Sequence, residues 1–203
     1  MASLEALPSE RAWELRERWL TGLGGKIEDK IEESYELASA VTQSIWSLAD
    51  ARAWRLRLAA RPAAPVAALA SVAGLDDPES WSWRRDMLAR APKVVMATLR
   101  EVDRPEAWRM RQQVAAACKE ALDGIEGMDQ PEAWALRDEH ADRWPSTVVK
   151  SLGPLADGPR GRRLLLRQLD AHGSNVSLLK HTAAVALGLH RLRTPSENSR
   201  GNG

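Results

Sequence analysis

The feature that most constrains the fold of this chain is a short recurring motif, a tryptophan followed three residues later by an arginine. The motif reads AWELR at Trp13, AWRLR at Trp54, SWSWR at Trp81, AWRMR at Trp108 and AWALR at Trp134. The residue numbers give intervals of 41, 27, 27 and 26 between successive tryptophans. Such a period is typical of helical repeat arrays, in which each unit buries its apolar faces against adjacent units.

Each regular unit carries signals for two short helices. Asp76, Asp103 and Asp129 each precede a glutamate by three residues, which is the spacing of a capping box, and a proline lies in the first turn that follows. A second set of prolines, at Pro65, Pro92 and Pro145, is predicted to end the first helix and open a second. The predicted fold is all-α, a right-handed α-solenoid of about six short helix-turn-helix repeats with a period of about 27 residues.

The repeat also predicts the domain organisation. We expect a single α-helical repeat domain over residues 1–193, with an irregular first unit over 9–50 and regular units over 50–157. Residues 157–193 are predicted to form a degenerate capping unit, because Arg160, Gly161 and Arg162 stand where the AWxLR motif is expected. Residues 194–203 are polar and aperiodic, so a disordered tail is predicted there.

Composition excludes several classes of protein. A formal net charge of +1 gives no global attraction to nucleic acid or anionic lipid. The single cysteine, Cys118, rules out an internal disulfide framework and a cysteine-based zinc site, and a reducing compartment is the default. No signal peptide and no membrane span is evident, so we predict a cytoplasmic protein with no membrane partner.

No stretch of the sequence indicates catalysis, a cofactor or a metal. The segment TGLGGKIED departs from a Walker phosphate loop, with Leu20 at the first glycine position and Ile27 at the magnesium-binding position. His172, His181 and His190 are spaced nine residues apart, which is not the spacing of a helical metal site. We therefore predict no catalytic residue, no metal ligand, no cofactor and a protein that is not an enzyme.

The recurring tryptophans and arginines allow two interpretations. As a structural core, Trp13, Trp54, Trp81, Trp108 and Trp134 would pack between repeats, and each arginine would bond an acidic residue of a neighbouring unit. As a functional ladder, indole and guanidinium groups would stack on bases or grip a peptide. We favour the core. The tryptophans outside the repeated phase, Trp19, Trp46, Trp83 and Trp144, are expected to be partly exposed.

Residues that the repeat does not require are the candidates for partner binding. In the best-formed unit these are His140, Arg143, Trp144 and Lys150. A second group is basic and lies near the C-terminus, with Arg160, Arg162, Arg163, Lys180 and His181. This group fits an acidic partner or a phosphate backbone. The alternative is the polar outer face that a capping unit must present to solvent.

With its aspartate before the first helix and its arginine within it, the unit resembles HEAT-like short α-helical repeats. The resemblance implies a polar ladder between units, in which Asp76, Asp103 and Asp129 take one role and Arg84, Arg111 and Arg137 the other. The segments AWELRERWL and WPSTVVKSLGPLA also look like the repeat-bearing C-terminal region attached to some bacterial thymidylate-kinase-like proteins. That second resemblance implies an accessory region without the kinase residues.

The function predicted from the sequence is a non-catalytic helical-repeat scaffold that binds a protein partner through its concave face. Two alternatives stay open: an accessory or regulatory domain of a thymidylate-like kinase, and a nucleic-acid-binding HEAT-like protein. The near-zero net charge disfavours nucleic acid. The oligomeric state is not indicated by any feature of the sequence.

Overall fold

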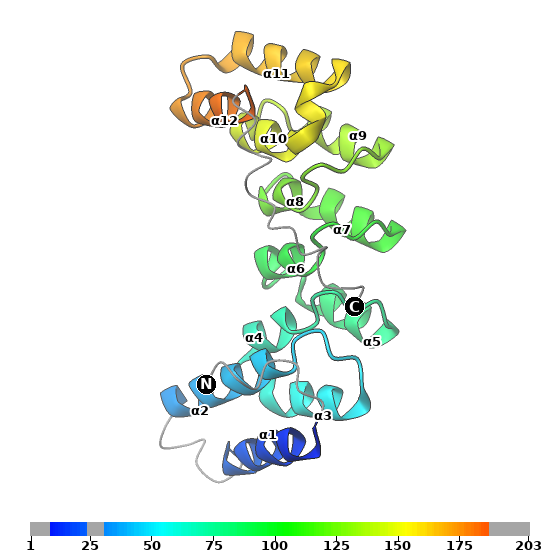
Figure 1. Ribbon diagram of the computed structural model, residues 1–203, viewed down its shortest axis with the longest axis vertical. Helices are drawn as coiled ribbons and strands as arrows, with labels where there is room; N and C mark the ends of the chain where they lie inside the picture. Colours follow the sequence, from blue (N-terminus) through cyan, green and yellow to red (C-terminus); the bar gives the residue numbers. More distant parts are fainter. Residues whose placement is uncertain (1–8, 24–30, 187–203) are drawn as a thin grey trace, which may run out of the picture. The chain divides into compact units, whose positions relative to one another are not determined.

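A computed structural model describes residues 9–23 and 31–186, and within these ranges all regular structure is helical. The described residues form twelve α-helices and one 3-10 helix, which confirms the predicted all-α class (Figure 1). The chain divides into two compact units, Met1–Val102 and Asp103–Gly203. The predicted disordered tail and part of the TGLGGKIED segment lie outside the described residues.

Unit 1 contains three helix pairs. Their bounds are α1 (Glu10–Leu23) with α2 (Ile31–Ser44), α3 (Ala51–Ala60) with α4 (Pro65–Ala70), and α5 (Pro78–Met87) with α6 (Pro92–Thr98). Within each pair the two helices touch, and α4 contacts both α2 and α6. The second helices of this unit therefore form a continuous packed row (Figure 1).

Unit 2 repeats the pattern with one addition. Its elements are α7 (Pro105–Val114), α8 (Glu120–Asp123), α9 (Pro131–Glu139), α10 (Pro145–Leu152), the 3-10 helix η2 (Gly153–Asp157), α11 (Pro159–His172) and α12 (Val176–Ala186). Helix α10 contacts α8 and α12, so the second helices again pack in a row. The extra turn η2 packs on α11 and connects it to α10.

Prolines begin seven of the described helices, and the sequence predicts six of these starts. Pro78, Pro105 and Pro131 are the first residues of α5, α7 and α9, where the missing N–H has no helical partner to lose. Pro65, Pro92 and Pro145 likewise open the second helices α4, α6 and α10. Local backbone chemistry therefore accounts for where most of these short helices start.

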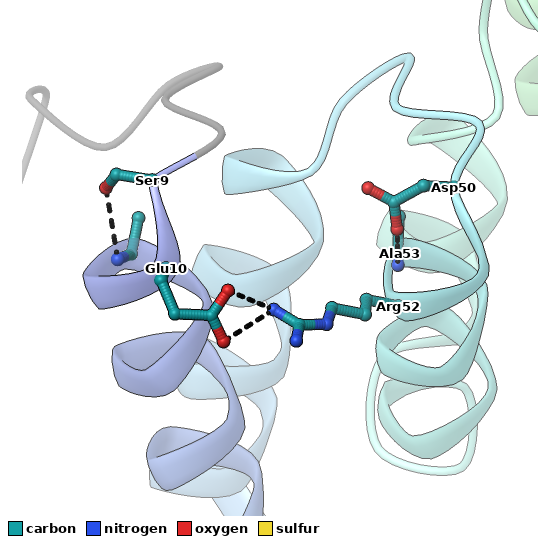
Figure 2. Close-up of polar contacts among 6 residues, drawn as sticks. Ser9, Glu10, Asp50, Arg52 and Ala53 are labelled. Atoms are coloured by element: carbon teal, nitrogen blue, oxygen red, sulfur yellow. Dashed lines mark hydrogen bonds and ion pairs between the residues drawn. The ribbon is translucent and has the colours of Figure 1, made fainter.

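Side-chain caps complete several helix starts in unit 1. Ser9 accepts the backbone N–H of Ala12 at 3.3 Å, and Asp50 accepts that of Ala53 at 2.8 Å (Figure 2). Beside these caps, Arg52 at the start of α3 donates to both carboxylate oxygens of Glu10 on α1, at 2.9 and 2.8 Å. This ion pair is exposed and adds little to stability, so the caps and the packing beneath carry the helix starts.

The apolar stripes of the second helices form the core of each unit. In unit 1, Val41 and Ile45 are fully buried and pack with Trp13, Ala53 and Leu56. In unit 2 the fully buried side chains include Leu122, Ile125, Val148, Leu152 and Leu178. These stripes are too narrow to stabilise an isolated short helix, so stability comes from neighbouring pairs covering one another.

One backbone position recurs in a left-handed conformation. Ser47, Gly74, Glu101 and Gly127 have φ of 60°, 78°, 60° and 75°, and each lies seven residues before a repeated tryptophan. The turn brings backbone N–H groups to the next pair, since Ser47 donates to the carbonyl of Ser71 and Gly127 to that of Ser151. Glycine adopts this conformation without the steric cost that a Cβ imposes.

Substitutions at this recurring turn should affect stability in opposite directions, depending on whether glycine is removed or introduced. Gly127→Ala should lower the free energy of unfolding by about 1–2 kcal/mol, because its new Cβ is disfavoured at positive φ and would lie 3.4 Å from Cδ of Pro154. Glu101→Gly at the equivalent turn should raise the free energy of unfolding by between zero and about 1 kcal/mol. The relief of backbone strain stabilises the folded state, and the greater entropy of the unfolded chain offsets part of this gain. Urea unfolding of both variants checks the pair, and a stabilising Gly127→Ala would contradict this account.

No helix among the described residues is both long and apolar enough to cross a bilayer.

Candidate functional site

Five helices carry the recurring motif in the same register. In α1, α3, α5, α7 and α9 the tryptophan is the fourth residue and the arginine is the seventh. The guanidinium carbon lies 4.4 to 5.0 Å from the centre of the indole ring of its own motif in all five. Helix α11 starts with proline like α9 but has Arg162 and Leu165 at these two positions, so the last pair lacks the motif.

The motif arginines are the most deeply buried large side chains in the described chain. Arg16, Arg57, Arg84, Arg111 and Arg137 have exposed fractions of 0 or 1%. Four of the five motif tryptophans are also buried, at 9% or less, while Trp54 is only partly buried. A buried charge needs compensating partners, so the contacts of these arginines decide whether the motif is structural.

Arg57 shows how the charge is compensated. Its Nε donates to the hydroxyl of Ser71 at 2.9 Å, and its Nη1 donates to the carbonyl of Leu48 at 2.8 Å. Its Nη2 donates to the carbonyls of Ile45 and Ser71, at 2.9 and 3.0 Å. Ile45 is the first residue after α2 and Leu48 lies three residues further on, so the guanidinium is placed near the C-terminal end of that helix, where the helix dipole favours a cation.

The same contacts recur in the next pairs. Arg137 donates to Ser151 Oγ at 3.0 Å and to carbonyls of Met128, Ile125 and Ser151 at 2.9, 2.8 and 2.8 Å. Arg84 likewise donates to Thr98 and to the carbonyls of Leu75 and Val72. The prediction that these arginines bond acidic residues is therefore wrong for Arg57, Arg84 and Arg137, because carbonyl and hydroxyl oxygens satisfy them.

Burial lowers the pKa of these guanidinium groups without discharging them. Because burial disfavours the charged form, the pKa of Arg57, Arg84, Arg111 and Arg137 falls from the ordinary arginine value to about 10. Each group therefore stays protonated at neutral pH. The guanidinium groups of Arg57, Arg84 and Arg137 are thus cationic clamps between the end of the preceding helix pair and the second helix of their own pair, and their burial makes them inaccessible to a ligand.

The aspartates before the motif also differ from their predicted role. Asp76, Asp103 and Asp129 accept hydrogen bonds from the indole Nε1 of Trp81, Trp108 and Trp134, at 2.9, 2.8 and 2.6 Å. The prediction that they cap the following helices is wrong, because Asp77, Arg104 and Gln130 occupy those N-cap positions. Each aspartate instead satisfies the polar edge of a buried tryptophan.

Three of the nine residues singled out for partner binding, His140, Trp144 and Lys150, have internal roles in unit 2. His140 is buried. Trp144 is partly buried and donates its indole N–H to the carbonyl of Ala115 at 2.9 Å. Lys150 forms a 2.7 Å ion pair with Asp123. Arg143 is exposed and stacks on Trp144. Arg162 and Lys180 are exposed, and His181 is partly buried. Arg160 and Arg163 line a groove described below.

A groove that the sequence did not predict lies in unit 1, and we call it the indole groove. It has a volume of about 510 Å³ and is lined by residues of α3, α5 and the turn after α3, among them Trp54, Leu58, Arg61, Glu79, Trp83 and Asp86. The rings of Trp54 and Trp83 meet edge to face with centroids 5.6 Å apart. Trp83 was expected to be partly exposed, and that expectation is wrong. Trp54 and Arg61 pack against its ring, and its exposed fraction is only 6%.

The rim of the indole groove combines apolar and acidic groups. Leu58 is 56% exposed, an unusual state for a leucine beside two tryptophans. Glu79 and Asp86 are exposed and form no ion pair or hydrogen bond with any residue that the structure describes. The one sequence signal for this site was the second tryptophan of SWSWR, Trp83, which the repeat does not require.

A second groove lies in unit 2, and we call it the arginine groove. It has a volume of about 240 Å³ and is lined by Trp134 and Asp138 of α9 and by Arg160, Arg163, Leu164 and Arg167 of α11. Arg167 bonds Asp138 at 2.9 Å, and Arg160 lies 3.6 Å from the same carboxylate. The structure thus brings together Arg160, Arg163 and Arg167 of the basic stretch GPRGRRLLLRQL, and it adds Trp134 and Asp138.

The single thiol of the chain is shielded from reaction. Cys118 is 3% exposed, and burial raises the pKa of its thiol to about 11. At pH 8 the folded protein should react with a thiol-specific reagent at least about 100-fold more slowly than the urea-unfolded chain, because the thiolate is scarce and covered. Stopped-flow labelling measures both rates, and equal rates would contradict the burial of Cys118.

Among the described residues there is no group of three or more histidine, cysteine, aspartate or glutamate side chains that could hold a metal ion. Comparisons of the chain with protein-family models, with curated proteins and with solved structures found no match. The grooves themselves therefore carry the functional argument.

Proposed function

We propose that this protein is a non-catalytic helical-repeat scaffold and that it binds a protein partner in the indole groove of unit 1. The proposal includes an α-solenoid arrangement of the helix pairs, similar to that of HEAT-like repeats. The identical placement of tryptophan and arginine in five helices and the recurring contacts of the arginines support that arrangement.

The indole groove is the single observation that carries the proposal. The partly exposed ring of Trp54 packs edge to face on the buried ring of Trp83, and the exposed Leu58 also lines the groove. Trp54 and Leu58 thus give a rigid apolar surface of the kind on which protein-binding hot spots are built. Two buried arginines hold α3 and α5 in place. Arg57 of α3 donates to the carbonyl of Leu48, and Arg84 of α5 donates to the carbonyl of Leu75. The surface is therefore formed before a partner arrives, which lowers the entropic cost of binding.

The charges of the groove define the chemistry of the partner. The carboxylates of Glu79 and Asp86, which have no partner among the described residues, line the groove. The lining cation Arg61 stacks on Trp83 at 5.2 Å. A complementary partner is a protein segment that places an aliphatic or aromatic side chain next to lysine or arginine. The same carboxylates would repel a phosphate backbone, which disfavours nucleic acid at this groove.

A displayed library of random peptides, panned on the immobilised full-length chain at physiological salt, tests the proposal. We expect enrichment of sequences that combine apolar and basic residues. Leu58→Glu should weaken the binding of an enriched peptide by about tenfold or more, because it replaces an exposed apolar contact of the groove by a charge. Asp86→Lys should weaken it in the same direction through charge repulsion.

A matched control separates the groove from the general surface. Val66 on α4 is 44% exposed and does not line the groove, so Val66→Glu should leave peptide affinity unchanged within about twofold. The proposal fails if the enriched peptides are acidic, if the library yields no enrichment, or if Leu58→Glu and Val66→Glu have equal effects.

A further inference from the structure

We infer that the arginine groove of unit 2 is a second binding site, and that it takes an acidic segment of a protein whose carboxylate replaces Asp138 against Arg167 and Arg160. The inference rests on contacts within unit 2 alone. It does not depend on the indole groove or on the function proposed for it.

Charge is the first argument for this site. Three guanidinium groups line the groove, on Arg160, Arg163 and Arg167, and they face one carboxylate, that of Asp138. Arg160 and Arg167 share this carboxylate and are each more than half exposed. Arg163 is exposed and has no ion pair or hydrogen bond with a described residue. The groove therefore has an excess of two positive charges and one unused donor group.

The second argument is that the donors are held in place before a ligand binds. The ring of Trp134 contacts two guanidinium groups, with Arg137 at 4.9 Å and Arg160 at 4.3 Å from its centre. Arg137 is buried and fixed by four hydrogen bonds, and Asp129 holds the indole N–H. The indole thus stacks Arg160 in a defined position, which suits a planar carboxylate.

The third argument is the contact that already exists. Asp138 shows that a carboxylate can lie between Arg160 and Arg167, at 3.6 and 2.9 Å. Its side chain is 46% exposed, so an external carboxylate can displace it into solvent at little cost. Asp138 then acts as an internal competitor, and the apparent affinity of the groove depends on how often its arginines are released.

The surroundings favour a protein segment over a nucleic acid. The groove holds about 240 Å³, enough for one or two side chains, and Leu164 and Trp134 offer apolar contact beside the charge. A polyanionic backbone would also approach the exposed carboxylates of Glu139 and Asp142, which are 69% and 94% exposed. Nucleic-acid binding draws on many phosphate contacts along an extended surface, whereas this site is a single cluster.

The test uses the full-length chain and a fluorescein-labelled peptide in which aspartate and glutamate alternate with leucine. A second peptide carries asparagine and glutamine in place of the acids, and a labelled DNA duplex is the third probe. Fluorescence anisotropy at physiological salt measures each dissociation constant, and circular dichroism verifies that every variant keeps its helical content.

Two pairs of variants make the test specific. Arg163→Glu should weaken binding of the acidic peptide by about tenfold or more, whereas Arg162→Glu, on the same helix but outside the groove, should weaken it by less than about threefold through screened charge alone. Asp138→Asn should strengthen binding by about three- to tenfold by removing the internal competitor. Asp170→Asn, an equal change of charge at an exposed site on α11, should change it by less than about twofold.

These outcomes decide the inference. It is supported if the acidic peptide binds, its amide counterpart does not, and the groove variants differ from their controls in the stated directions. It is overturned if Arg163→Glu and Arg162→Glu weaken binding equally, if Asp138→Asn has no larger effect than Asp170→Asn, or if the DNA duplex binds more tightly than the peptide.

Discussion

Replacing Arg137 by methionine should lower the free energy of unfolding by about 3–5 kcal/mol. Methionine retains much of the apolar stem but has no donor. The substitution leaves the hydroxyl of Ser151 and the carbonyls of Met128, Ile125 and Ser151 without the hydrogen bonds that Arg137 supplies. Urea titration followed by circular dichroism measures the loss.

Two further variants identify its cause. Arg137→Lys keeps the charge but cannot reach all four acceptors from one ammonium group, so we expect an intermediate loss of about 2–3 kcal/mol. Arg85→Met removes an exposed arginine of α5 and should cost less than about 0.5 kcal/mol. A loss below about 1 kcal/mol for Arg137→Met would mean that water replaces the guanidinium, contrary to the burial described here.

The lowered pKa determines where in the pH range the clamp titrates. Burial brings the pKa of Arg137 to about 10, whereas the unfolded chain keeps the higher, ordinary value of an arginine. Between these values the unfolded state binds more protons than the folded state, so this group makes the unfolding free energy rise with pH there. Below about pH 9 both states are protonated and the group adds no pH dependence, which makes neutral pH suitable for comparing the variants.

Trp108→Ala should lower the free energy of unfolding by about 3–5 kcal/mol, the cost typical of removing a large buried aromatic side chain. The indole is 6% exposed, its N–H is bonded to Asp103 at 2.8 Å, and its ring lies 4.4 Å from the guanidinium carbon of Arg111. Alanine leaves a cavity, removes the cation–π contact and deprives Asp103 of a donor. Calorimetric melting and urea titration both report the loss.

The matched control is an exposed tryptophan. Trp46 is 48% exposed, so Trp46→Ala should cost less than about 1 kcal/mol. Trp108→Phe keeps an aromatic ring but loses the N–H donor, and we expect about 1–2 kcal/mol, which isolates the hydrogen bond to Asp103. If Trp108→Ala cost no more than Trp46→Ala, the motif indole would not be a core residue.

The candidate sites were only partly predictable from the sequence. The basic run at Arg160, Arg162 and Arg163 marked the neighbourhood of the arginine groove, yet it did not separate Arg163, which lines the groove, from Arg162, which does not. The indole groove was not predicted, because Trp54 and Glu79 are brought together by the packing of α3 and α5 and not by a local pattern. The acceptors of Arg137 lie 9, 12 and 14 residues away, beyond the reach of helical periodicity.

By itself, the sequence determined the helical class, the starts of the helices and the spacing of the tryptophan and arginine motif. Prolines and hydrophobic periodicity act within one or two turns, so their consequences can be deduced without knowing the fold. Tertiary structure alone decided that the motif arginines bind carbonyl oxygens, that Asp129 accepts from Trp134, and that Trp83 is covered. These outcomes depend on which buried donor meets which unsatisfied acceptor once neighbouring helix pairs pack, and that pairing is set by the geometry of the packed helices.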